Sequence, residues 1–168
     1  KNEADYEGHI VNTASMAGLL NAPTMGVYNV SKHAVVSLSE TLYHDLQLVD
    51  APIGASVLCP FFVPTGISQS ERNRPEDAQA GVATASQRVA KIMTHKAVMS
   101  GKVTAQQVAE HTFDSIQTGQ FYIYSHPEAL SGVQTRMEDM TQQRNPSDPY
   151  AAKPQVREKL QSKLKEQL

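Results

Sequence analysis

The sequence predicts an α/β fold with an open, parallel β-sheet, and three observations lead to it. Three short apolar segments, residues 9–14, 55–59 and 121–125, have the length and composition of buried parallel strands. Segments with the apolar spacing of helices separate these strands along the chain. The first strand ends in small and polar residues, which is where an open α/β sheet binds its ligands.

Composition places the chain among ordinary globular proteins and excludes several classes. Of its 168 residues, 40% are hydrophobic and 19% are charged, which suits one domain with a real core. The formal net charge of -2 shows no excess of positive charge that would favour binding to nucleic acid or to an anionic membrane. No apolar run reaches the length of a membrane span. The single cysteine, Cys59, excludes an internal disulfide and fits a reducing compartment, so we expect a cytoplasmic location.

The first element is a strand that leads into a long helix. Residues 1–7 are polar and predict the end of a helix and a loop, and the absence of an initiating methionine suggests a fragment. Residues 8–18 then predict a short strand and its polar end. After a loop with Pro23 and Gly26, the spacing of apolar residues predicts a long buried helix over 27–48. Its apolar positions are Val27, Val30, Ala34, Val35, Leu38, Leu42 and Leu46.

Tyr28 and Lys32 lie four residues apart in this helix, so their side chains share one face. A free tyrosine titrates near ~10, and an adjacent cation favours the phenolate and lowers the pKa. Lowering the tyrosine pKa by ~3 units requires that the phenolate be stabilised by about 4 kcal/mol relative to the phenol. One lysine and a cationic cofactor ring could together supply this stabilisation. The pair could then act as a general acid/base, while the Ser15 hydroxyl holds a substrate oxygen. The alternative is an exposed helix face on which the lysine packs its alkyl stem.

These residues in their surroundings resemble the short-chain dehydrogenase/reductase (SDR) family. The resemblance runs from about residue 5 to residue 126, and its motifs are the strand at 9–18, Ser15 thirteen positions before Tyr28, Tyr-Asn-Val-Ser-Lys-His-Ala at 28–34, and Cys-Pro-Phe-Phe-Val-Pro-Thr at 59–65. It implies hydride transfer between NAD or NADP and a small-molecule carbonyl or alcohol. It also implies that Tyr28 is the acid/base, that Lys32 lowers its pKa and binds the nicotinamide ribose, and that Ser15 polarises the carbonyl.

The resemblance also assigns roles to the loop after the second strand. It implies that Pro60, Val63 and Thr65 meet the nicotinamide end of the cofactor. Phe61 stands where the family usually has glycine, and glycine permits backbone angles that phenylalanine resists. We therefore expect altered geometry at this position. Phe61 and Phe62 either form an apolar substrate wall or simply pack in the interior.

The resemblance covers only the C-terminal half of such an enzyme. No Gly-x-x-x-Gly-x-Gly turn, which would cradle a pyrophosphate, occurs in the chain. We expect a partial Rossmann-like, doubly wound sheet without its N-terminal nucleotide-binding half, and a fragment that is inactive alone. Ile10 and Val11 would then lie on an open edge covered by another copy, a separate half or further residues. The alternative function is a non-enzymatic assembly or scaffold module with a truncated fold, which the intact mass of the native protein would reveal.

The remaining segments predict a substrate lid and a helical tail. Residues 66–101 are polar, with one or two short helices including 83–93, and such segments often act as mobile lids. A capping box at 104–107 starts a helix that Gly119 ends. Residues 128–144 read as helical and complete the main domain, 1–144. Residues 145–168 form a linker and a charged C-terminal helix.

Two partner predictions remain. In the family the helix at 27–48 helps to form a subunit interface, so the resemblance implies a homo-oligomer. The six histidines show no ligand spacing with one another or with Cys59, so we expect no metal site.

Overall fold

The structure is a computed structural model that describes residues 7–75 and 81–166 of the 168-residue chain. Most of the predicted polar start, residues 1–7, and residues 76–80 of the predicted lid lie outside the described residues. The chain forms two compact units, which we describe separately. The first unit comprises Lys1–Phe61 and Ala105–Gln134, and the second comprises Phe62–Thr104 and Thr135–Leu168.

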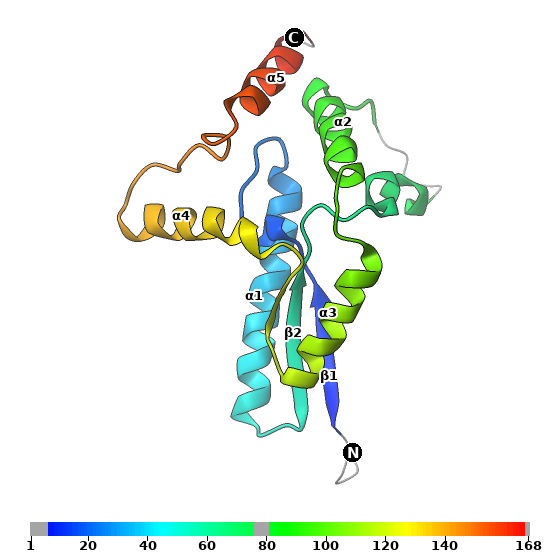
Figure 1. The fold of residues 1–168 in the computed structure, drawn as a ribbon, viewed down its shortest axis with the longest axis vertical. Coiled ribbons are helices and arrows are strands. Elements are labelled where there is room, and N and C mark those ends of the chain that lie inside the picture. The colour runs from blue at the N-terminus through cyan, green and yellow to red at the C-terminus, as the bar shows by residue number, and fades with distance from the viewer. Residues whose placement is uncertain (1–6, 76–80, 167–168) are drawn as a thin grey trace. The chain divides into compact units, whose positions relative to one another are not determined.

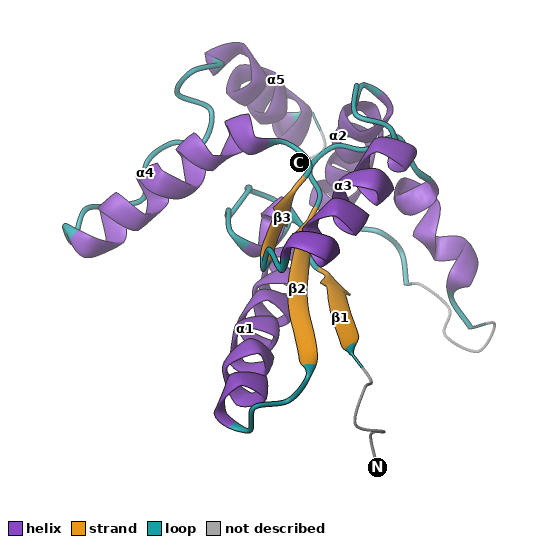
Figure 2. Cartoon of the chain, turned by 60° about the horizontal axis from the view of Figure 1, so that its bottom comes forward, coloured by secondary structure: helices purple, strands orange, loops and turns teal. Residues whose placement is uncertain are grey.

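The first unit contains a sheet of three parallel strands in the order β1-β2-β3, which confirms the predicted fold class (Figure 2). In the pairing register, Asn12 lies beside Val57, and Val57 lies beside Tyr122. Because all three strands point the same way, their carboxyl ends meet at one edge. The strands are β1 (Gly8–Thr13), β2 (Ile53–Cys59) and β3 (Tyr122–Tyr124).

A row of hydrogen bonds between polar side chains and backbone crosses this sheet. The His9 Nε2 atom on β1 lies 2.7 Å from the fully buried Ser56 Oγ on β2. The Ser56 hydroxyl donates to the Gln120 carbonyl oxygen at 2.7 Å, so the histidine N–H is the donor to Ser56. The His9 ring lies against Gly54, where an added Cβ would fall 2.4 Å from Nδ1. The row therefore joins β1 and β2 to Gln120, which lies just before β3.

The helix α1 (Gly26–Leu48) follows β1, as predicted, and packs on the sheet (Figure 1). Its predicted buried face is partly wrong, since Val27, Val30 and Leu38 are 88%, 71% and 65% exposed. The buried side chains are instead Asn29, Val36 and Ser39. Two of these are polar: the Ser39 hydroxyl both accepts and donates a hydrogen bond, while Asn29 donates through Nδ2 and its buried Oδ1 has no partner among the described residues.

Ser39 joins α1 to β1. Its hydroxyl accepts a hydrogen bond from Asn12 Nδ2 at 3.1 Å and donates to the Val35 carbonyl oxygen at 2.7 Å. Further along the helix, the Tyr122 hydroxyl of β3 donates to Glu40 Oε1 at 2.7 Å. Partial burial, followed by this hydrogen bond, raises the pKa of Tyr122, so the phenol stays protonated at neutral pH. These bonds fix the helix against strands on both sides of β2.

The core of the first unit lies near the carboxyl ends of β1 and β2. Its buried members are Ala14, Met16, Val36, Val57 and Cys59. The short 3-10 helix η1 (Met16–Gly18) packs against α1 so closely that a Cβ on Gly18 would lie 2.6 Å from the Lys32 carbonyl oxygen. Glycine is therefore required at this contact. The close packing brings the start of α1 to the end of β1.

The crossover to β3 is the helix α3 (Ala105–Thr118). Gly119 has a φ of +68° and ends the helix, as the sequence predicts. On this helix Phe113 is 68% exposed, while the polar residue Ser115 is buried. The Ser115 hydroxyl is satisfied by the His111 carbonyl oxygen at 2.8 Å. The 3-10 helix η3 (Pro127–Ala129) and the first residues of α4 (Leu130–Thr141) complete this unit.

The second unit is helical. It comprises η2 (Gly66–Asn73), α2 (Ala85–Met99), the end of α4, and α5 (Pro154–Lys165), which contacts α2. A Thr84–Gln87 capping box begins α2. Asp139 on α4 accepts the Ser147 backbone N–H at 2.8 Å and pairs with Arg144. These contacts, the Ser147 hydrogen bonds first, hold the pKa of Asp139 below its usual value.

Two further findings concern the unpaired side of β1 and the lack of a membrane-spanning helix among the described residues. The strand β1 pairs only with β2 among them, and Ile10 on β1 is 38% exposed. What covers the other side of β1 stays a prediction. In the parts of the chain that the structure describes, none of the helices combines the length and the apolar character that crossing a bilayer requires.

Candidate active site

Ser15 lies just after β1, at the carboxyl edge of the sheet. It caps η1, with its Oγ atom accepting the Ala17 backbone N–H at 3.1 Å. The Ser15 hydroxyl donates to the Pro60 carbonyl oxygen at 3.3 Å, and the Met16 N–H donates to the same oxygen at 2.9 Å. The long hydroxyl bond leaves this proton available to a better acceptor, such as a bound substrate oxygen.

Tyr28 and Lys32 share one face at the start of α1, as their spacing predicts. The Lys32 Nζ atom lies 5.7 Å from the centroid of the Tyr28 ring. It also donates to the Thr13 carbonyl oxygen at the end of β1, over 3.3 Å. The ammonium therefore lies beside both the phenol and the strand that leads to Ser15, and all three side chains belong to the first unit.

Asn29 holds the loop that connects Ser15 to Tyr28. It is 5% exposed, and its Nδ2 donates to the Ala22 carbonyl oxygen at 3.0 Å. Sequence reasoning missed this residue, because a polar side chain beside a candidate tyrosine gives no sign that it is buried. The tight loop also includes Thr24, whose φ is +67°.

Cys59 is buried directly behind this site. Burial raises the pKa of its thiol to about 11, although the backbone hydrogen bond from Ser15 acts in the opposite direction. The thiol is thus protonated at neutral pH and is a poor nucleophile. Among the described residues, no cluster of three or more histidine, cysteine or acidic side chains could hold a metal ion.

Phe61 stands at the position of the usual glycine without a left-handed backbone. The non-glycine residues with a left-handed φ in the described ranges are Thr24, Asp50 and Gln143, so Phe61 does not need glycine's freedom. Its backbone N–H donates to Ser125 Oγ at 3.0 Å, and its ring meets the His126 ring edge-on at 5.8 Å. Side chains after β3 therefore hold this loop, and sequence reasoning missed both of them.

The structure does not bring every predicted site residue into one unit. Phe62, Val63 and Thr65 belong to the second unit. Val63 is buried there, and Thr65 caps η2 by accepting the Ile67 N–H at 3.4 Å. The hydroxyl of Thr65 thus has a local structural use, and the cofactor contacts of these residues stay predictions.

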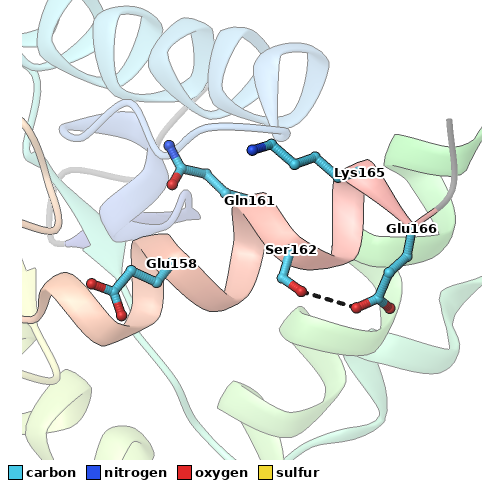
Figure 3. A pocket seen from close by; sticks show the side chains of 5 residues that line it. All are labelled: Glu158, Gln161, Ser162, Lys165 and Glu166. Carbon is cyan, nitrogen blue, oxygen red and sulfur yellow. Dashed lines mark hydrogen bonds between the residues drawn. The ribbon is translucent and has the colours of Figure 1, made fainter.

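A surface hollow of about 480 Å³ lies along α5 in the second unit (Figure 3). The residues that line it all come from the C-terminal helix region, α5 and the residue that follows it: Glu158, Gln161, Ser162, Lys165 and Glu166. The Ser162 hydroxyl donates to Glu166 Oε1 at 2.9 Å. Because none of the candidate residues lines this hollow, we do not assign the active site to it.

Comparisons with known proteins agree with the motifs. A family model described as short chain dehydrogenase matches residues 3–76. A CLA biosynthesis dehydrogenase/reductase from Lactiplantibacillus plantarum is 32% identical over 136 residues, covering 76% of this chain and 46% of the relative. Retinol dehydrogenase 10 from Xenopus tropicalis is 39% identical over 70 residues, which cover 41% of this chain and 20% of that protein.

A solved structure agrees more closely. The crystal structure of a short chain dehydrogenase/reductase from Burkholderia phymatum in complex with NAD is 53% identical, with a TM-score of 0.83. The match covers 86% of this chain and 52% of that one.

The chain thus spans about half the length of the bacterial relatives it matches. The expectation that it contains only a C-terminal half is not confirmed, since the family model matches its N-terminal residues 3–76. In its parallel sheet, its strand-end residues and these matches, the chain is similar to members of the short-chain dehydrogenase/reductase family.

Proposed function

We propose that the whole protein is an NAD- or NADP-dependent oxidoreductase that interconverts a small carbonyl compound and its alcohol. The observation that carries this proposal is that the Lys32 ammonium lies near the Tyr28 ring and bonds the Thr13 carbonyl oxygen, two residues before Ser15, at the carboxyl edge of one parallel sheet. That edge is where such sheets bind ligands. The NAD in the Burkholderia structure supports a nicotinamide cofactor.

The donor set at Lys32 fits such a cofactor. An ammonium has three N–H donors, and the Lys32 ammonium uses one of them on the Thr13 carbonyl oxygen. Its other donors suit the hydroxyls of a ribose. The cofactor, when bound, supplies or accepts the hydride. Pro60, Val63 and Thr65 are proposed to contact its nicotinamide end, while Phe61 and Phe62 are proposed to meet the substrate.

The side chains of this site would handle the proton and the developing charge. During reduction, the Tyr28 hydroxyl donates its proton to the substrate oxygen, and the C=O π bond is lost as hydride reaches the carbon. Lys32 stabilises the resulting phenolate by its positive charge. Ser15 turns its hydroxyl from Pro60 to the substrate oxygen and holds it in place. Oxidation of the alcohol uses the same groups in reverse.

Turnover of the whole protein tests this proposal directly. We expect it to oxidise or form reduced nicotinamide, followed by near-ultraviolet absorbance, with at least one member of a panel of ketones, aldehydes and secondary alcohols. Cofactor binding measured by calorimetry is the accompanying control. A protein that binds neither NAD(H) nor NADP(H) would contradict the proposal.

We further propose that a second copy packs on the exposed apolar side of α1. Val27, Val30, Ala34 and Leu38 are exposed along this side, at spacings of three and four residues. We expect Leu38→Glu to lower the molar mass in solution to that of one chain, because a buried unpaired carboxylate is costly. Gln47→Glu adds the same charge at an exposed polar position of α1 and should leave the mass unchanged. Light scattering would measure both, and an unchanged mass for Leu38→Glu would refute this interface.

A further inference from the structure

The peptide between Pro60 and Phe61 is held on both sides at the carboxyl end of β2. On the β1 side, its carbonyl oxygen accepts the Ser15 hydroxyl at 3.3 Å and the Met16 N–H at 2.9 Å. On the β3 side, its N–H donates to Ser125 Oγ at 3.0 Å. One rigid amide therefore links the ends of all three strands.

Ser125 is itself oriented by its neighbour. Its Oγ atom lies 2.8 Å from His126 Nδ1, and the His126 ring meets the Phe61 ring edge-on. Since Ser125 Oγ accepts the Phe61 N–H, its own proton is free to be donated to Nδ1 of a neutral histidine. The hydroxyl is thus placed to accept from the loop after β2.

This arrangement affects Ser15, although Ser125 is 110 residues away in the sequence. A peptide is planar, so the direction of its N–H fixes the direction of its C=O. If the N–H loses its acceptor, the amide is held only on its carbonyl side, where the Met16 N–H bond of 2.9 Å can act as a pivot, and a tilt of the peptide lengthens the weaker bond of 3.3 Å from Ser15. The Ser15 hydroxyl would then lose the acceptor that fixes the direction of its proton, and only the Ala17 N–H would still hold its oxygen.

We propose that Ser125 is a positioning residue, which aligns the Ser15 hydroxyl through the Pro60–Phe61 peptide without touching the substrate. This inference rests on the proposed function, because it assigns a role within the same reaction. It also explains how the loop is held at Phe61, where the sequence departs from the family pattern.

Ser125→Ala and Ser125→Thr in the whole protein test the inference, with two measurements for each variant. Hydrogen exchange of the Phe61 amide should become about tenfold faster in Ser125→Ala, because its acceptor is lost. The kcat per folded molecule should fall about tenfold, since Ser15 is misaligned, while the KM for the cofactor stays unchanged. Ser125→Thr keeps the hydroxyl and should restore both values.

Thr118→Ala is the matched control, because it removes a hydroxyl that bonds within α3. It should change neither measurement. Unchanged exchange at Phe61 in Ser125→Ala would overturn the inference, whatever the activity. Faster exchange with a wild-type kcat would also overturn it, since Ser125 would then be merely structural. Absence of turnover in the wild-type protein would instead overturn the proposed function, and the catalytic role of Ser125 with it.

Discussion

Tyr28→Phe is expected to lower kcat by about 10³-fold while cofactor binding stays close to that of the wild type, because general acid/base groups contribute typically 10²–10⁴-fold. Phenylalanine keeps the ring that packs beside Lys32 and removes only the hydroxyl that donates the proton. The loss should therefore appear in kcat. Steady-state kinetics of the whole protein, together with calorimetric titration of the cofactor, would measure it.

Tyr43→Phe is the matched control for this variant. Tyr43 lies on the same helix, and its edge-on contact with the Phe121 ring does not require the hydroxyl. We expect wild-type kinetics from it. If Tyr28→Phe retained wild-type turnover, the proton would come from another group, and the acid/base role of Tyr28 would be lost.

Lys32→Met is expected to lower kcat by about 10²-fold and to raise the KM for the cofactor. Methionine keeps most of the apolar length of the side chain but removes the charge that stabilises the phenolate, and interactions with charged groups contribute about 1.5–3 kcal/mol. The hydrogen bond to Thr13 is lost as well, so the start of α1 is less firmly joined to β1. Steady-state kinetics with cofactor and substrate varied separately would resolve the two effects.

Lys159→Met provides the comparison, because Lys159 is an exposed lysine of α5 in the second unit. It should behave like the wild type. Unchanged kcat and KM in Lys32→Met would show that the ammonium beside the Tyr28 ring has no part in the reaction.

The sequence predicts the elements well, because local spacing and turn residues determine them. The three strands were each predicted within about two residues, and Gly119 ends α3 as expected. Which face of a helix is buried depends on what packs against it. On α1 the stripe through Val30 and Leu38 is exposed, while Asn29 and Ser39 are buried. Apolar spacing cannot reveal that a polar side chain is buried when it makes hydrogen bonds in the fold, as the Asn29 amide nitrogen does with the Ala22 carbonyl oxygen and the Ser39 hydroxyl does with the Val35 carbonyl oxygen.

Only those parts of the candidate site that depend on local spacing can be predicted from the sequence. Tyr28 and Lys32 are one turn apart, so local geometry brings them together. Ser125 is joined to Phe61 across 64 residues, and only the folded sheet places them side by side. Phe61 does not adopt a left-handed φ, so it replaces the usual glycine without that backbone conformation, and the altered contact geometry expected there stays a prediction.

The row from His9 through Ser56 to Gln120 has a consequence for how the strands align. In β2, Ala55, Ser56 and Val57 are all buried, so no alternation of exposed and buried residues distinguishes one alignment from its neighbours. Sliding β1 by one residue would separate His9 from Ser56 and leave polar groups unsatisfied, at a cost of about 1–3 kcal/mol. The same alignment determines that Ser15 arrives opposite Pro60. A hydrogen bond far from the chemistry thus selects the one pairing of strands in which the reactive side chains can meet.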